Sequence, residues 1–219
     1  MEKRAFVGKE EIILSSRFQK IFDVLSITLR LILGVFLFPF VYSATRVFLS
    51  KIFMLDNSLK IGFFSGMAFF LIIYLFVWEP TIIYKKGQRF VQVIFGFFSP
   101  LVKVAPYLLP IYTIILFLSY FLLSLIFRIE HVLDVFMFLF GVSIALHFVF
   151  SAKFLKSKSS DYLKANYIFS FSLIWLLNIF ILSFGFNLIL NNFSFVDFFN
   201  QTIDLGCNIF NAIFKQLFL

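Results

Sequence analysis

Five long apolar stretches constrain this chain more than any other feature of its sequence. They cover residues 26–49, 61–78, 106–127, 132–152 and 167–190. Each can cross the ~30 Å hydrocarbon core of a bilayer as a helix that rises ~1.5 Å per residue. Because lipid offers the backbone no hydrogen bonds, such segments must form helices or a closed barrel. The apolar residues run on without the alternation of barrel strands, so we predict about five transmembrane helices.

The composition supports the same class of protein. Hydrophobic residues make up 62% of the 219 positions and charged residues only 14%. In a soluble domain roughly half of the residues are apolar and about a quarter are charged. We therefore expect an all-α, polytopic membrane helix bundle that forms a single integral membrane domain over residues 1–219. The first 20 residues are polar and lack a small-residue cleavage site, so we do not expect a removable signal peptide. The single cysteine, Cys207, excludes an internal disulfide.

Lysine and arginine are distributed unevenly between the connections. The N-terminal segment and the second and fourth connections together hold thirteen, whereas the first and third connections and the tail hold five. Because basic residues accumulate on the cytoplasmic side, we predict a cytoplasmic N-terminus in a bacterial cytoplasmic membrane. This rule also accounts for the net charge of +8. We therefore expect membrane lipids and other membrane subunits as partners, and no nucleic acid.

Two further segments are apolar without being simple spans. Phe90–Val104 is short, contains Pro100 and lies in the second connection, which suggests a half-membrane or interfacial segment on the cytoplasmic side. The tail, residues 194–219, repeats polar residues at helical spacing opposite apolar ones, which predicts an amphipathic helix. Ser194 followed by Asp197 is typical of a capping box at its start. We expect this helix to lie in the outer interface or to pack on a partner.

Polar residues inside the spans are the candidates for function, because burying them in lipid is costly. His147 lies near the middle of the fourth span, where it either hydrogen-bonds a neighbouring helix or serves a metal or a proton. Asn178, in the fifth span, is typical of a helix–helix hydrogen bond. Asp134 is expected near the outer end. His131, His147 and Cys207 are spread over different depths, so no metal site and no cofactor are predicted.

The second span contains Gly62 and Gly66 on either side of Ser65. The pattern is superficially similar to the nucleophile turn of an intramembrane serine protease, but its spacing differs by one residue. Small residues four positions apart are also typical of a close contact between two membrane helices. We favour the helix contact.

Residues Pro80 to Asn178 resemble a group of bacterial membrane proteins related to site-2-protease-like zinc metallopeptidases. The most specific part is Ala105-Pro106-Tyr107-Leu108-Leu109-Pro110-Ile111-Tyr112-Thr113, which is similar to an Ala-Pro-Tyr-Phe-x-Pro-x-Tyr-Thr segment of that group. The remaining matches, over about 100 residues, are Pro80, Tyr84, Gly87, Ala145-Leu146-His147, Asp161, Ser170 and Asn178. The resemblance implies a helical membrane scaffold with a zinc-binding helix after Tyr84.

The catalytic part of that pattern is absent. The two zinc-binding histidines of the group fall on Gln88 and Gln92, and its general base falls on Arg89. Glutamine supplies no imidazole, and arginine cannot accept a proton at physiological pH. The resemblance therefore implies a pseudo-enzyme that keeps the scaffold without the catalytic centre. The alternative is that Gln88–Val104 is simply a basic amphipathic stretch on the cytoplasmic face.

Three functions follow from these observations. The first is a non-catalytic subunit or scaffold of a membrane complex, and a pseudo-protease if the resemblance holds. The second is a transporter or channel component that uses His147 and Asn178, because Pro106 and Pro110 predict an interrupted helix of the kind that forms substrate sites. The third is an intramembrane metalloprotease, which would require zinc. We expect the first.

Overall fold

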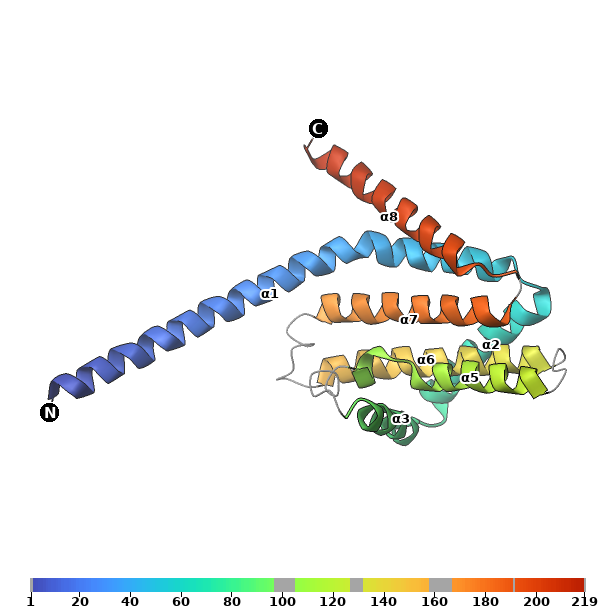
Figure 1. The fold of residues 1–219 in the computed structure, drawn as a ribbon, viewed down its shortest axis with the longest axis horizontal. Coiled ribbons are helices and arrows are strands. Elements are labelled where there is room, and N and C mark those ends of the chain that lie inside the picture. The colour runs from blue at the N-terminus through green and yellow to red at the C-terminus, as the bar shows by residue number, and fades with distance from the viewer. Residues whose placement is uncertain (1, 97–104, 127–131, 158–166, 191, 219) are drawn as a thin grey trace.

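A computed structural model describes residues 2–96, 105–126, 132–157, 167–190 and 192–218, with only the helix course given for residues 2–18, 20, 157, 217 and 218 (Figure 1). Its described elements are helices, which confirms the predicted all-α fold. They are α1 (Glu2–Phe53), α2 (Asn57–Phe76), α3 (Thr81–Ile94), α5 (Ile111–Ile126), α6 (Leu133–Ser157), α7 (Tyr167–Ile189) and α8 (Phe195–Phe218).

Four of the described helices are long and apolar enough to cross a membrane. They are α1 over Ile21–Phe53, α2, α6 over Leu133–Lys156, and α7. The fifth predicted span corresponds to α5, which begins only at Ile111 and is shorter at 16 residues, or about 24 Å. The reason is Pro110, whose nitrogen carries no hydrogen to continue a helix from the preceding turn. The chain is thus an integral membrane protein with several helical spans.

The helices alternate in direction, so the connections fall at two ends of the bundle. Helices α1, α5 and α7 run one way, and α2, α6 and α8 run back (Figure 1). At one end α2 and α6 finish and α5 and α7 begin, and Lys85, Lys86, Lys153 and Lys156 lie at this basic end. The second and fourth connections therefore share an end, as the charge distribution predicts. Which end faces the cytoplasm stays a prediction.

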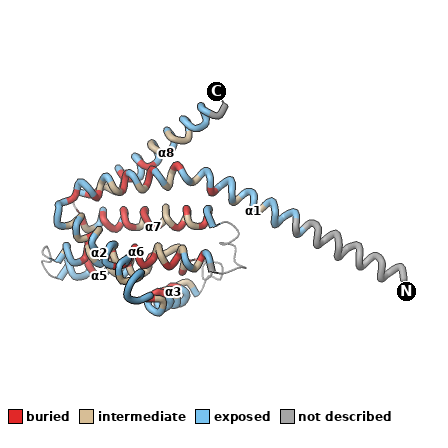
Figure 2. Tube along the Cα trace, turned by 180° about the vertical axis from the view of Figure 1, so that it is seen from behind, coloured by how far each residue is buried: buried red, intermediate tan, exposed pale blue. Residues whose placement is uncertain are grey.

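Helices α6 and α7 form the centre of the bundle, and the buried positions concentrate on them (Figure 2). Helix α2 packs along α6, whereas α1 packs along α7. Phenylalanines fill the space between these pairs. Phe186 of α7 is fully buried and lies within 6.1 Å, between ring centroids, of five other rings, those of Phe48, Phe63, Phe117, Phe140 and Phe193.

The glycines of α2 lie at its contact with α6, which confirms the expected helix contact. A Cβ atom on Gly62 would lie 3.1 Å from the Asp134 carbonyl oxygen, and one on Gly66 would overlap the Phe138 carbonyl. Gly141 of α6 approaches the Phe63 carbonyl in the same way. Two backbones can come this close only where neither helix carries a side chain at the contact.

Helix α1 is far longer than the predicted span over residues 26–49. Its 52 residues would measure ~78 Å, more than twice the hydrocarbon thickness. The start of α7 lies beside Gly34, whose Cβ would be 3.2 Å from the Phe169 nitrogen. The part of α1 before Gly34 therefore extends beyond the bundle at the basic end (Figure 1).

The second connection contains more structure than the sequence indicated. Helix α3 begins at Thr81, within the segment assigned to a loop, and ends at Ile94. It forms because Tyr84, Gly87 and Val91 fall on one face and are buried against the bundle, while the basic residues point outward. Only the first part of Phe90–Val104 can be compared, because residues 97–104 lie outside the described part of the chain.

The amphipathic tail helix is confirmed as α8. The Ser194 hydroxyl accepts a hydrogen bond from the Asp197 backbone N–H at 3.2 Å, which is the N-cap bond that the sequence predicts. The Asn187 side chain accepts a second one from the Phe195 N–H at 2.9 Å. From this start α8 turns back and packs along α1. These contacts place α8 beside a spanning helix, and its predicted contact with a partner stays a prediction.

Candidate functional site

The break between Ala105 and Pro110 is where the polar side chains of the spans meet. One helical turn closes with the bond from the Leu109 N–H to the Ala105 carbonyl at 2.9 Å, and α5 opens with the bond from the Ile114 N–H to the Pro110 carbonyl at 3.0 Å. Between these bonds, the carbonyl groups of residues 107 and 108 point at side chains of α6 and α7. Buried carbonyls need such partners, since water is excluded.

Side chains from α6 and α7 supply those partners. Ser151 donates to the Tyr107 carbonyl at 3.3 Å, and the His147 ring hydrogen-bonds the same carbonyl. The Asn178 Nδ2 atom donates to the Leu108 carbonyl at 3.1 Å and to the Ile174 carbonyl at 2.6 Å. The two candidate residues predicted in the spans, His147 and Asn178, are therefore joined through one interrupted segment.

A buried hydrogen-bonded chain extends from this segment to α3. The Tyr84 hydroxyl lies 3.0 Å from the Ser151 hydroxyl, which lies 3.3 Å from His147 Nε2. Gln88, Tyr84 and His147 line a cavity of about 10 Å³ beside Pro106 and Pro110. That volume holds about one water molecule. The cavity is too small for a substrate molecule. The polar side chains that line it can hold only a water molecule or a proton.

Charged groups lie at the basic end, outside this cavity. Lys153 forms an ion pair with Glu79, whose carboxylate also accepts a hydrogen bond from Thr81. The hydrogen bond from Lys153, and after it the one from Thr81, hold the pKa of Glu79 below its usual range. On α3, burial raises the pKa of Tyr84 to about 12, so its hydroxyl stays protonated at neutral pH.

The structure separates the residues that the metallopeptidase resemblance groups together. Gln88 reaches the cavity, while Arg89 and Gln92 are exposed on α3. Asp161 lies outside the described residues. Asp134 is at the end opposite the basic one, where the Ser58 hydroxyl hydrogen-bonds its carboxylate. Within the described part of the chain, no three His, Cys, Asp or Glu side chains lie close enough together to hold a metal ion.

A second polar feature, which sequence reasoning missed, lies between α1 and α8. We call it the polar groove; its volume is about 410 Å³, and it is lined by Arg46, Val47, Ser50, Gln201, Asp204, Leu205 and Asn208. Arg46, Asp204 and Asn208 are exposed. Two sequence features could have indicated the groove: an arginine inside the first apolar stretch and a polar stripe along the tail. Nothing in the sequence indicated that the two would lie side by side.

The polar groove lies at the depth of the spans. Phe210 of α8 packs on Phe36 of α1, with ring centroids 5.2 Å apart, and a Cβ on Gly206 would lie 2.6 Å from the Phe40 ring. Phe198, near the start of α8, packs 5.3 Å from Phe180 of α7. Helix α8 therefore runs beside the same stretch of α1 that packs on the spanning helix α7.

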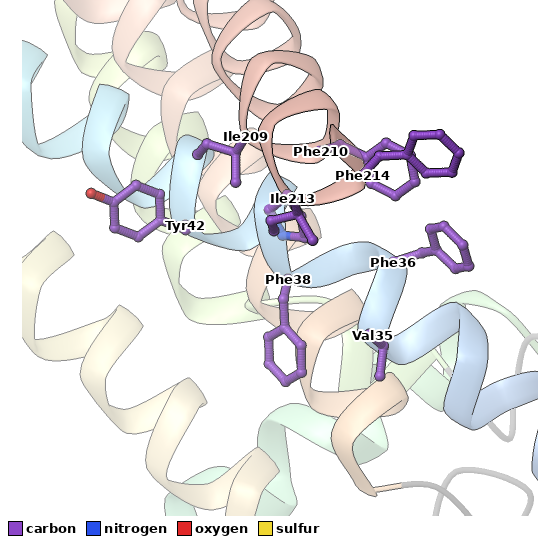
Figure 3. Close-up of a pocket in the computed structure, with 9 residues that line it drawn as sticks. Val35, Phe36, Phe38, Tyr42, Ile209, Phe210, Ile213 and Phe214 are labelled. Carbon is purple, nitrogen blue, oxygen red and sulfur yellow. The ribbon is translucent and has the colours of Figure 1, made fainter. Parts of the chain in front are cut away.

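Beyond the polar groove, α1 and α8 diverge and leave an apolar cleft of about 640 Å³ (Figure 3). Pro39 and Tyr42 of α1 form one wall, and the side chains of the last turns of α8 form the other. The α1–α8 face is thus polar over one half and apolar over the other.

No family model, curated protein or solved structure matches this chain.

Replacing Asn178 by leucine should lower the free energy of unfolding by about 1–2 kcal/mol. The substitution leaves the buried Leu108 carbonyl without its donor, and hydrogen bonds between membrane helices contribute energies of about this size. Thermal unfolding in bicelles, followed by near-UV circular dichroism, measures the loss. Asn192→Leu, at an exposed position between α7 and α8, is the control and should change little. Equal stability of the two variants would contradict a structural role for Asn178.

Proposed function

We propose that this protein is a non-catalytic subunit or scaffold of a membrane complex, held to its partners through the α1–α8 face. The observation that carries the proposal is the polar groove, which exposes Arg46, Asp204 and Asn208 beside a membrane-spanning helix. A soluble protein can leave such residues in water. In a bilayer the same surface would face hydrocarbon unless another molecule covered it.

The exposed charges of the polar groove are costly in a bilayer. An arginine or aspartate placed at the centre of a membrane helix costs about 2.5–3.5 kcal/mol on insertion scales. Arg46 precedes the end of α1 by only two turns, so part of its cost is relieved by reaching toward the headgroups. Asp204 has a short side chain and lies nine residues into α8. It cannot reach so far, and a polar partner would remove the cost.

The interrupted segment also supports a non-catalytic role. His147 and Asn178 hydrogen-bond the carbonyls of Tyr107 and Leu108, at the end of the helical turn that is interrupted before Pro110. These hydrogen bonds therefore hold α5, α6 and α7 together. If the metallopeptidase resemblance holds, the chain keeps the helical scaffold of that group but not its general base. Arg89, which stands at the position of that base, is exposed and permanently charged.

Extraction in a mild detergent or in native nanodiscs, followed by native mass spectrometry, tests the proposal. We expect an assembly with a fixed stoichiometry and a mass well above the 25.7 kDa of one chain. A monomer at membrane concentrations, in more than one extraction medium, would overturn it.

A second candidate function is favoured by one observation. His147 and Asn178 contact the same interrupted segment, and interrupted helices form ion and substrate sites in transporters. Proteoliposomes should then show a proton or solute flux that His147→Ala abolishes. A flux that this substitution leaves unchanged would count against the transporter.

A further inference from the structure

We infer that the polar groove is covered by a second copy of this chain, related by a two-fold axis along the membrane normal. The inference rests on the proposed function and names its partner. Three features support it: the charges in the groove, their depth in the membrane, and the single orientation that the chain must adopt.

The groove carries one cation and one anion that form no ion pair with each other. Arg46 and Asp204 line the same groove from different helices, and neither takes part in an ion pair among the described residues. A foreign partner would need charges matched to both. A second copy supplies them without any further requirement, because its Asp204 can face Arg46 while its Arg46 faces Asp204.

The depth of the two charges fits this symmetry. A two-fold contact is isologous, so a residue i that meets j is accompanied by j meeting i. When the axis runs along the membrane normal, residues that meet must lie at equal depth. Arg46 and Asp204 come close to this condition, since both line one groove between two adjacent helices.

The amides of the groove are compatible with the same contact. Gln201 and Asn208 each carry a hydrogen-bond donor and an acceptor, so each can hydrogen-bond a polar side chain of the facing groove. Ser50 has the same property. A surface made of such groups and of two opposite charges is self-complementary.

An antiparallel arrangement would also match charges, but the membrane excludes it. Pairing two α8 helices head to tail would place Asp197 opposite Lys215 and Gln201 opposite Asn211. That contact requires the two chains to insert in opposite orientations. The excess of lysine and arginine on one side, thirteen against five, favours a single orientation. The parallel dimer remains.

A charge-exchange experiment in membranes tests the inference. Arg46→Asp gives a chain with two acids in the groove, and Asp204→Arg gives a chain with two bases. Each variant alone should lose at least tenfold in dimer fraction, because like charges then meet at both contacts. When the two are expressed together with different tags, an acidic groove meets a basic one, and a mixed dimer should be recovered at near the wild-type level.

Lys85→Glu is the matched control, because it reverses an exposed charge on α3, away from the groove. It should dimerise as the wild type does. The milder pair Arg46→Gln and Asp204→Asn tests the same contacts if a reversal impairs insertion, and each should weaken the dimer. Dimerisation of the single reversals at the wild-type level, or failure of the mixed pair to recover, would overturn the inference.

Cross-linking through a cysteine in α8 gives an independent reading. In a Cys207→Ala background, Asn208→Cys on the groove should form an inter-chain disulfide under mild oxidation in native membranes. Ile203→Cys, on the exposed apolar side of α8, is the control and should cross-link far less. A higher disulfide yield from Ile203→Cys than from Asn208→Cys would contradict the inference that the two chains meet at the groove.

The outcomes separate this inference from the proposed function. A homodimer that follows the charge rules supports both. A stoichiometric complex with a different membrane protein, without self-association, overturns the second copy and leaves the proposed function in place. A monomeric chain overturns both.

Discussion

Replacing Phe186 by alanine should lower the free energy of unfolding by about 3 kcal/mol, within the range measured for buried phenylalanines in soluble cores. Phe186 is fully buried, and five aromatic rings surround it. In a bilayer the unfolded reference is also apolar, so little of this loss comes from transfer out of water. It comes from the cavity, whose lining loses dispersion contacts that no neighbouring atom replaces.

The matched control is Phe76→Ala, because Phe76 is 82% exposed at the end of α2. Both variants lose the same atoms, so comparing them isolates packing from composition. Chemical unfolding in mixed micelles, followed by tryptophan fluorescence, measures both free energies. Trp175 stacks on Phe148 with ring centroids 4.3 Å apart, so its emission should report the packing of α7 on α6. If the two variants lost equal stability, the aromatic cluster would not be the core of this bundle.

Replacing Gly66 by leucine should have a similar or larger effect. Even a Cβ atom at this position would overlap the Phe138 carbonyl, and leucine adds three more carbon atoms at the same place. Overpacking a well-packed contact usually costs about 1–3 kcal/mol, and more when backbone rather than a side chain must move. Here α2 must separate from α6, and the contacts of Gly141 with Phe63 would be lost as well.

The control for this substitution is Ala68→Leu, two residues further along α2 at an exposed position. It adds the same kind of bulk on the outward face, where lipid can adapt to it. Thermal aggregation in detergent is measured by size-exclusion chromatography. The non-aggregated Gly66→Leu protein should disappear at a much lower temperature than the Ala68→Leu protein. Comparable melting of the two variants would contradict the close approach of α2 and α6.

Much of the fold could be predicted because a bilayer restricts what a chain can do. A continuous apolar run of about twenty residues has to become a helix, since its backbone groups find no other partners. The spans over residues 61–78 and 167–190 consequently match α2 and α7 to within a few residues at either end. The tail helix and its cap at Ser194 followed from spacing alone.

The misses have equally physical causes. Hydropathy does not predict α3 because its apolar residues recur only on one face, so its mean hydropathy is low; only the metallopeptidase resemblance implies a helix after Tyr84. The length of α1 was missed because its polar first turns do not resemble a span. The sequence predicts His147 and Asn178 as candidates, but no spacing rule could show that both meet the carbonyls of Tyr107 and Leu108, where the helix is interrupted before Pro110.

By itself, the sequence determined that this protein is a helical membrane bundle, because hydrophobic length and helical periodicity are local properties of a chain in lipid. The tertiary structure alone decided which polar groups meet. Arg46 and Asp204 are 158 positions apart in the sequence, and they share a groove only because α8 turns back along α1. Such contacts depend on how whole helices pack, which no local pattern specifies.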